Sequence, residues 1–175
     1  IYTLSPPVSR PIFLSTYHIA GATNKAGYET LSALNLNGNR ELARYTFTND
    51  QVDFTCSFLN DVAVDNDRGV VYITDSGIMC HPLKGALLVY NMKNGQAKKV
   101  LTNPEWVNDQ PGFTFSIHGE KVLKDKEGKA NSMLTGADGT ALSGYTKTLY
   151  RTNLTGKRLM SVPTSLLRDF SNSEA

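Results

Sequence analysis

The segment Asn60-Asp61-Val62-Ala63-Val64-Asp65 continues to Val71-Tyr72-Ile73-Thr74-Asp75-Ser76-Gly77, and a second copy of the pattern begins at Asp138-Gly139-Thr140-Ala141-Leu142-Ser143. Each copy opens with Asn or Asp and continues through a short apolar-rich run and a polar turn. Each then reaches a tyrosine twelve residues after its first residue, at Tyr72 and at Tyr150. The chain therefore contains one supersecondary unit at least twice.

The segments around this repeat predict β-strands rather than helices. Residues 29–36 and 41–47 alternate between apolar and polar side chains, and Asn37-Gly38-Asn39 separates the two segments. An Asn-Gly turn between two alternating segments is a strong hairpin signal. Four further strands are expected at 62–65, 70–74, 85–91 and 97–101, with Asn94-Gly95 turning the last pair. A repeated all-β unit of roughly 40 to 50 residues is typical of a β-propeller blade.

We therefore predict a single partial propeller domain over residues 1–175. Its expected parts are an irregular lead-in at 1–27 with one strand near 12–17, the outer hairpin of one blade at 28–47, a complete blade at 60–101, an insertion at 102–135, and the next blade at 138–169. The insertion should contain strands at 113–117 and 121–123 around a His118-Gly119 turn, and Trp106 should be a packing residue. The second copy should supply strands at 140–142, 148–152 and 158–162. Helical periodicity is confined to one turn within 163–169, which Thr164 or Ser165 could cap.

The charge and hydropathy of the chain exclude two classes of partner. The net charge is +2, and the 18 basic residues are spread along the 175-residue sequence. Such a distribution gives no basic patch for nucleic acid or an anionic membrane. No apolar run approaches the roughly 20 residues that cross a bilayer. The chain opens with Ile1 rather than Met, so we expect a longer precursor.

Two cysteines and one sequon bear on the cellular compartment. Cys56 and Cys80 flank the first copy of the repeat, where they are either two buried thiols or a disulfide formed in an oxidising compartment. Asn153-Leu154-Thr155 is a possible glycosylation sequon in an expected loop. Together these features favour an extracellular, secreted protein.

Several blocks of the sequence resemble the yellow and major royal jelly protein family. They are Ser57-Phe58-Leu59-Asn60-Asp61-Val62-Ala63-Val64-Asp65, then Gly85-Ala86-Leu87-Leu88-Val89-Tyr90, and above all Val162-Pro163-Thr164-Ser165-Leu166-Leu167-Arg168-Asp169. The resemblance covers about residues 28–169 and is weak over 102–135. It implies a six-bladed propeller, of which this chain supplies about two and a half blades. The remaining blades would come from the same polypeptide or from partner chains.

The resemblance also implies a secreted, non-catalytic protein that binds a small molecule, since some relatives bind small amines or sterols. In a propeller, residues that begin the innermost strands face the central channel, so Asn60, Asp61 and Asp138 should converge there from neighbouring blades. Phe58 and Phe113 would help to line that pocket. The opposing interpretation is that these Asn and Asp side chains close turns by binding their own backbone, as we expect for Asp65, Asp75 and Ser76.

An enzymatic alternative follows from the blade pattern shared with the regucalcin and gluconolactonase family. There a divalent cation such as Ca²⁺, held by Glu, Asn and Asp residues, polarises a lactone carbonyl. Asn60 and Asp138 would be metal ligands under this hypothesis, although an Asn would be expected at position 138 and two further ligands would lie outside this sequence. No catalytic residue can be assigned, and no cofactor is expected under the ligand-binding hypothesis.

Overall fold

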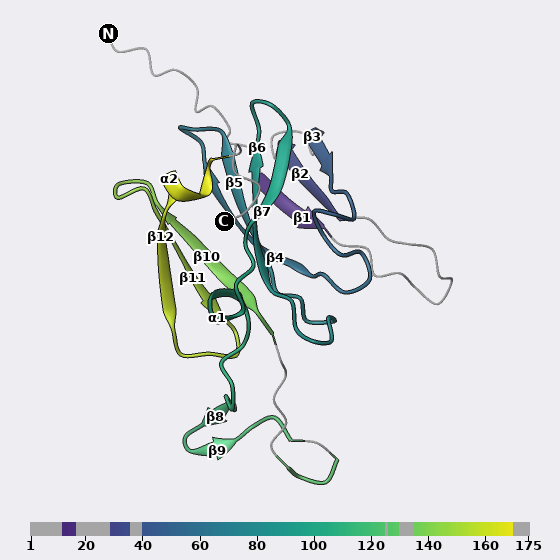
Figure 1. The fold of residues 1–175 in the computed structure, drawn as a ribbon, viewed down its shortest axis with the longest axis vertical. Coiled ribbons are helices and arrows are strands. Elements are labelled where there is room, and N and C mark those ends of the chain that lie inside the picture. The colour runs from purple at the N-terminus through teal and green to yellow at the C-terminus, as the bar shows by residue number, and fades with distance from the viewer. Residues whose placement is uncertain (1–11, 17–28, 36–39, 125, 130–134, 170–175) are drawn as a thin grey trace.

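The fold consists almost entirely of antiparallel β-sheet (Figure 1). The computed structural model describes residues 12–16, 29–35, 40–124, 126–129 and 135–169. Its strands are β1 (Ile12–Thr16), β2 (Thr30–Asn35), β3 (Arg40–Thr46), β4 (Leu59–Asp65), β5 (Val70–Asp75), β6 (Ala86–Asn91), β7 (Gln96–Leu101), β8 (Ser116–Ile117), β9 (Glu120–Lys121), β10 (Ala137–Ser143), β11 (Thr148–Asn153) and β12 (Leu159–Pro163). Two short helices are α1 (Pro104–Val107) and α2 (Thr164–Leu167). The all-β prediction is confirmed.

Turn chemistry in the sequence explains where the strands of the central sheet end. Gly69 has φ +72° and donates its N–H to Asp65 O at 2.8 Å between β4 and β5. Gly95 has φ +69° and donates to Asn91 O at 2.9 Å between β6 and β7. Glycine adopts this left-handed conformation without steric cost, so these turns hold four strands in the order β4-β5-β6-β7. The Asn37-Gly38-Asn39 turn lies outside the described residues, but β2 and β3, which flank it, are paired.

The internal repeat of the sequence is also a repeat of strand register. In the central sheet Leu59 pairs with Asp75, and after a bulge Val62 pairs with Ile73. In the last sheet Ala137 pairs with Asn153, and after a bulge Thr140 pairs with Arg151. Asn60 and Asp138 therefore occupy the same bulge in two successive sheets.

Neighbouring sheets pack against one another through their faces. Strand β4 contacts β10 on one side and β1 on the other. One apolar cluster joins the central sheet to the last one and includes Tyr72, Leu87 and Leu149, all fully buried. A second cluster joins the central sheet to the first and includes Leu31 and Phe47. Burial of these side chains between sheets is the main force that holds adjacent blades together.

The three main sheets together supply two and a half blades. The central sheet has four strands, whereas the sheets β1-β2-β3 and β10-β11-β12 have three each. The chain passes from β3 directly to β4, as it does from the outermost strand of one blade to the innermost strand of the next. We therefore take β1 to β3 as the outer three strands of one blade and β10 to β12 as the inner three of another.

The insertion between β7 and β10 differs from the expectation in three ways. A helix, α1, begins at Pro104, where Asn103 Oδ1 accepts the Glu105 N–H at 3.0 Å as an N-cap. The strand expected at 113–117 is only β8, and the strand expected at 121–123 ends at Lys121. Trp106 is 41% exposed and so packs less than predicted. In Figure 1 the β8–β9 hairpin projects away from the main sheets.

The short helix α2 forms where a helical turn was predicted, but its start differs. Pro163 is the N-cap residue, and neither Thr164 nor Ser165 caps the helix through its side chain. The expected cap is therefore wrong, because the extended conformation of Pro163 at the end of β12 itself starts the turn.

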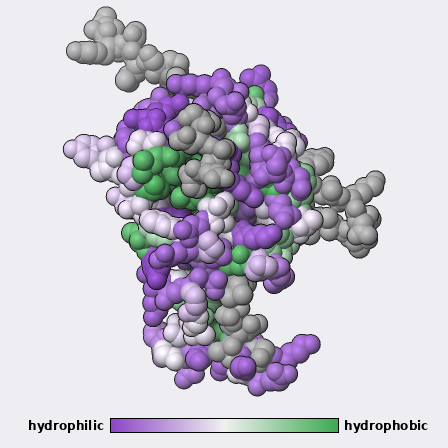
Figure 2. All heavy atoms as spheres, viewed as in Figure 1, coloured by the Kyte–Doolittle hydropathy of each residue, from purple (hydrophilic) through white to green (hydrophobic). Residues whose placement is uncertain are grey.

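The surface is largely polar in the view of Figure 2, with small hydrophobic areas. Leu159 on β12 and Leu166 on α2 are among the exposed apolar residues. Among the described residues, no helix has the length and apolar character needed to cross a membrane.

Candidate functional site

Asn60 and Asp138 meet at the inner edge of two successive blades. Asn60 Nδ2 donates to Asp138 Oδ1 at 2.5 Å. At the other end of the same strands, Lys147 Nζ and Asp67 Oδ2 form an ion pair at 2.9 Å. Strands β4 and β10 therefore run side by side in the same direction, and their first residues are neighbours. We call the group formed by Asn60, Asp61 and Asp138 the inner-rim cluster.

Asp61 joins the two blades through backbone groups. Its Oδ1 accepts the N–H of Val62 at 2.8 Å, and its Oδ2 accepts the N–H of Thr140 at 2.7 Å. Both carboxylate oxygens are thus engaged by donors that the bulges of β4 and β10 expose. Asp61 is accordingly a structural member of the cluster, as the turn-closing interpretation predicts for Asp and Asn residues.

Asp138 is the member of the cluster with unused binding capacity. It is half-buried, and its backbone carbonyl accepts the Thr74 hydroxyl at 2.5 Å. Burial raises the pKa of the Asp138 carboxyl and the negative charge of Asp61 adds to this, while the hydrogen bond from Asn60 opposes it. Among the described residues, none donates a hydrogen bond to Asp138 Oδ2.

The inner-rim cluster does not have the ligand set of a metal centre. Asn60 presents its amide nitrogen, not its oxygen, to Asp138. Calcium takes roughly six to eight oxygen ligands. No group of three or more His, Cys, Asp or Glu residues within the described part of the chain could hold a metal ion. The described residues alone thus do not fit the cation that the hydrolase alternative requires.

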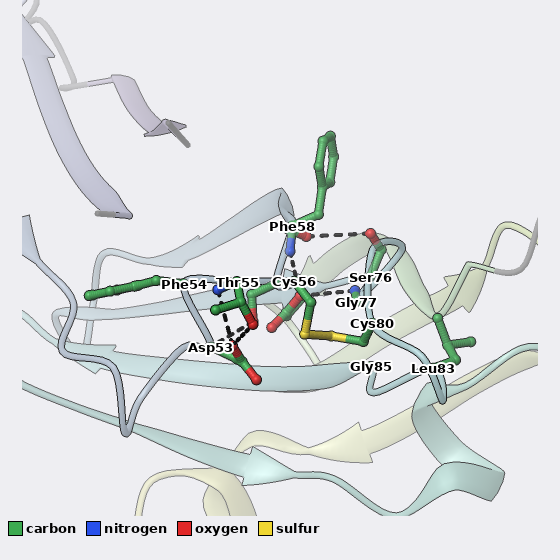
Figure 3. The surroundings of a disulfide bond; sticks show 12 residues. Asp53, Phe54, Thr55, Cys56, Phe58, Ser76, Gly77, Cys80, Leu83 and Gly85 are labelled. Carbon is green, nitrogen blue, oxygen red and sulfur yellow. Dashed lines mark hydrogen bonds between the residues drawn. A yellow bond between two sulfur atoms is a disulfide. The ribbon is translucent and has the colours of Figure 1, made fainter. Parts of the chain in front are cut away.

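The two phenylalanines predicted to line the ligand site lie in different surroundings. Phe113 belongs to the insertion and packs edge-on against Phe115, with ring centroids 5.0 Å apart. Phe58 precedes β4, and its ring points away from the disulfide in Figure 3. Neither residue lines the cavity of about 400 Å³ that lies beside α1.

Cys56 and Cys80 form a disulfide, with Cα atoms 4.6 Å apart (Figure 3). It joins the segment before β4 to the loop after β5. Asp75 fastens the same region, because its Oδ1 accepts the N–H groups of Phe58 and Gly77, each at 2.9 Å. Asp75 thus bonds backbone in a turn as predicted, and Asp65 does so too by accepting the Arg68 N–H at 3.3 Å.

Asn153, the sequon asparagine, is 9% exposed at the end of β11. Its Nδ2, the atom that glycosylation modifies, donates to the Asn108 carbonyl. Its Oδ1 accepts from Arg151 Nη1 at 2.7 Å. The burial of Asn153 disfavours the predicted glycosylation at this position, because a glycan would need to replace a buried hydrogen bond.

We accordingly expect Asn153 to carry no glycan in protein produced through a eukaryotic secretory pathway. The measurement is peptide mass spectrometry before and after enzymatic deglycosylation. The peptide that contains Asn153 should have its unmodified mass in both samples. A glycan mass on that peptide, or deamidation of Asn153 only after deglycosylation, would show the opposite.

A cavity of about 400 Å³ lies beside α1, is formed partly by Glu105, Asp109 and Arg158, and was not predicted from the sequence. A signal for α1 itself was present, since Asn103-Pro104-Glu105 combines an N-cap residue, a proline at the first helical position and an acidic first turn. That the β11–β12 loop lies opposite this helix follows only from the packing of two blades.

β-Propellers consist of four-stranded antiparallel sheets that pack face to face around an axis. The four-stranded central sheet and the last sheet of this chain, which repeat in register, place the fold in that class. The model of the family described as "Major royal jelly protein" matches residues 18–175, so the chain belongs to this family. A comparison with curated proteins gives no match.

Proposed function

We propose that the chain is part of a secreted, non-catalytic protein that binds a small ligand at the inner-rim cluster. The observation that carries this proposal is the carboxylate of Asp138, a half-buried residue at the start of an inner strand, whose Oδ2 accepts no hydrogen bond from a described residue. Asn60 donates to that carboxylate, and Asp61 fixes the strand that carries it by accepting the Thr140 N–H. A pre-positioned acceptor of this kind suits a ligand that donates hydrogen bonds.

The charge of the cluster favours a cationic amine as the ligand class. Asp61 and Asp138 are both carboxylates, and no Lys or Arg side chain of the described residues forms an ion pair with either. An ammonium group would donate hydrogen bonds and also relieve the repulsion between these carboxylates. The remaining wall of the site would come from further blades, either of the same polypeptide or of partner chains.

The disulfide supports the extracellular part of the proposal. Disulfides persist in oxidising compartments and are rare in the cytosol. Cys56 and Cys80 are bonded to each other, and there is no free cysteine in the described residues.

Replacing the charge at position 138 tests the proposed site. In the full-length protein, Asp138→Asn keeps the acceptor for Asn60 but removes the negative charge, so the affinity for tyramine or histamine should fall about tenfold or more. Isothermal titration calorimetry measures this change. Asp67→Asn is the matched control, because Asp67 is an exposed aspartate whose ion pair with Lys147 lies at the opposite end of the strands.

Two results would count against the proposal. One is that neither amine binds the wild-type protein at millimolar concentration. The other is that Asp138→Asn and Asp67→Asn bind the amine equally well.

A further inference from the structure

A second cavity, separate from the inner-rim cluster, lies between the insertion and the last sheet. It has a volume of about 400 Å³. Pro104, Glu105 and Asp109 line it from the α1 side, and Asn153, Gly156 and Arg158 line it from the β11–β12 side. We call this cavity the α1 pocket. Its volume lies within the range of small-ligand sites, roughly 300 to 1,000 Å³.

The α1 wall of the pocket is fixed to the central blade. Val107, the last residue of α1, is fully buried. The backbone passes so close to the helix that a Cβ atom on Gly85 would lie 2.1 Å from Val107 O, and one on Gly136 would lie 2.3 Å from it. Asn108 Oδ1 also accepts the Gly85 N–H at 2.8 Å. These close contacts fix the position of α1 relative to the central blade.

The opposite wall is tied to the first by two hydrogen bonds of Gln110, one from its backbone and one to its side chain. Gln110 donates its N–H to Thr155 O at 2.8 Å, and Gln110 Oε1 accepts the N–H of Lys157 at 3.2 Å. These bonds join the segment after α1 to the loop between β11 and β12. Both walls are thus held in place without a ligand, which lowers the entropy cost of binding one.

Buried polar groups form the inner side of the pocket. Asn153 lines the cavity, and both ends of its amide are engaged, by Asn108 O and by Arg151. Arg151 is 2% exposed, and burial lowers the pKa of its guanidinium to about 10. No carboxylate among the described residues forms an ion pair with Arg151. Its positive charge therefore lies directly behind the Asn153 side of the pocket.

The charges around the pocket balance. Glu105 and Asp109 contribute two negative charges to the lining, and Arg158 contributes one positive charge. Arg151, behind Asn153, supplies the second positive charge. A balanced site has no overall preference for a cation or an anion.

The lining offers donors and acceptors at several points. The Asp109 carboxylate, for which no described residue is a hydrogen-bond partner, is an acceptor, and Arg158 is a donor. Glu105 and Arg158 lie 3.8 Å apart and are both exposed, so water competes for each. The rings of Pro104 and Pro111 add apolar surface. This combination suits a neutral ligand that carries many hydroxyl groups on a compact ring with apolar C–H faces.

We propose that the α1 pocket is a saccharide-binding site that takes a mono- or disaccharide. The proposal is independent of the function assigned to the inner-rim cluster, because Asn60, Asp61 and Asp138 are not part of the lining. Arg158 and Asp109 bind ligand hydroxyls. The Gln110 and Asn153 amides keep the two walls in register, and the Asn108 amide holds α1 on the central blade.

The test is a titration of the full-length protein with glucose, mannose, galactose, sucrose and trehalose, monitored by saturation-transfer NMR and calorimetry. At least one saccharide should bind saturably. Asp109→Ala should weaken that binding about tenfold, the loss expected for one charged acceptor. Asp67→Ala, at an exposed aspartate outside the pocket, should leave it unchanged.

A second pair of variants consists of one substitution that fills the cavity without changing its charge and one matched control. A Cβ atom on Gly156 would meet its nearest atoms only at 3.7 Å, so Gly156→Leu is compatible with the backbone and occupies the pocket. It should abolish saccharide binding. Gly144→Leu is the matched control, because a Cβ atom there has nothing within 4 Å.

The outcomes separate this proposal from that for the inner rim. Saccharide binding that is lost in Asp109→Ala and Gly156→Leu but kept in Asp138→Asn supports the α1 pocket. Absence of binding for all five saccharides overturns it, and so does binding that neither pocket variant weakens. Binding of tyramine, but of no saccharide, that depends on Asp109 would also overturn it.

Discussion

Glu29→Gln should stabilise the folded protein by about 3 kcal/mol at about pH 9 and leave its stability nearly unchanged at about pH 4. Glu29 precedes β2 and is only 5% exposed, and its Oε2 has no hydrogen-bond partner among the described residues. Burial, and secondly the negative charge of Asp75, raise the pKa of Glu29 from 4.5 to about 7. Asp75 is itself 1% exposed, and no residue in the described part of the chain forms a hydrogen bond with its Oδ2.

The direction of the effect follows from which state binds the proton. Below pH 4.5 the carboxyl is protonated in both the folded and the unfolded chain and has no effect on stability. As the pH rises from 4.5 to about 7, the unfolded chain releases its proton first, so the free energy of unfolding falls. Above about pH 7 the folded protein holds a buried carboxylate beside a second one. Glutamine resembles the protonated form and avoids this cost.

Urea unfolding of both proteins across this pH range measures the difference. Glu120→Gln, at an exposed position in β9, controls for the loss of one carboxylate from the chain. A Glu29→Gln variant whose stability follows that of the wild type at every pH would show that Glu29 does not titrate in this window.

Removing the disulfide should cost about 3 kcal/mol of stability, the second large effect that we expect. Cys56 and Cys80 are 24 residues apart in the sequence, and a cross-link over a loop of that size restricts the unfolded chain. In the folded protein the same loop is also held by hydrogen bonds, including one from the Ser76 N–H to Phe58 O at 2.9 Å. The double variant Cys56→Ser/Cys80→Ser should therefore fold to the same structure with a lower unfolding midpoint.

The comparison needs the reduced wild-type protein as well. Its unfolding midpoint in dithiothreitol should match that of the double variant, and dithiothreitol should not alter the variant itself. If the oxidised wild type and the variant unfold at the same denaturant concentration, the cross-link contributes nothing to stability.

Local signals in the sequence predicted the sheets well and the insertion poorly. The ends of strands β4 to β7 were predicted to within a few residues. Runs of β-branched residues and Asn-Gly turns are local signals, because each involves only a few neighbouring residues. The strand at 113–117 was overestimated, since Phe113 and Phe115 pack on each other instead of joining a sheet. In the insertion, packing between segments overrides local preference.

Several side-chain environments could not be predicted from the same sequence. The burial of Asn153 requires the carbonyl of Asn108, 45 residues away in the chain, to meet its side chain, whereas Arg151 lies on the same strand. The raised pKa of Glu29 likewise depends on its burial and on the nearby charge of Asp75, from another strand. Neither environment has a sequence signature, because one deciding partner, Asn108 for Asn153 and Asp75 for Glu29, is far away in the chain.

The sequence alone determined the repeat, and with it the contact between residues 60 and 138. Successive blades built from the same pattern place equivalent residues side by side. It also placed the two cysteines around one strand pair. Only the tertiary structure decided that the cysteines are bonded, that Asp61 ties two blades together, and that α1 and the β11–β12 loop enclose a cavity. The reason is physical: periodicity and turn residues act within a strand pair, whereas bonds and cavities between blades depend on how complete sheets pack.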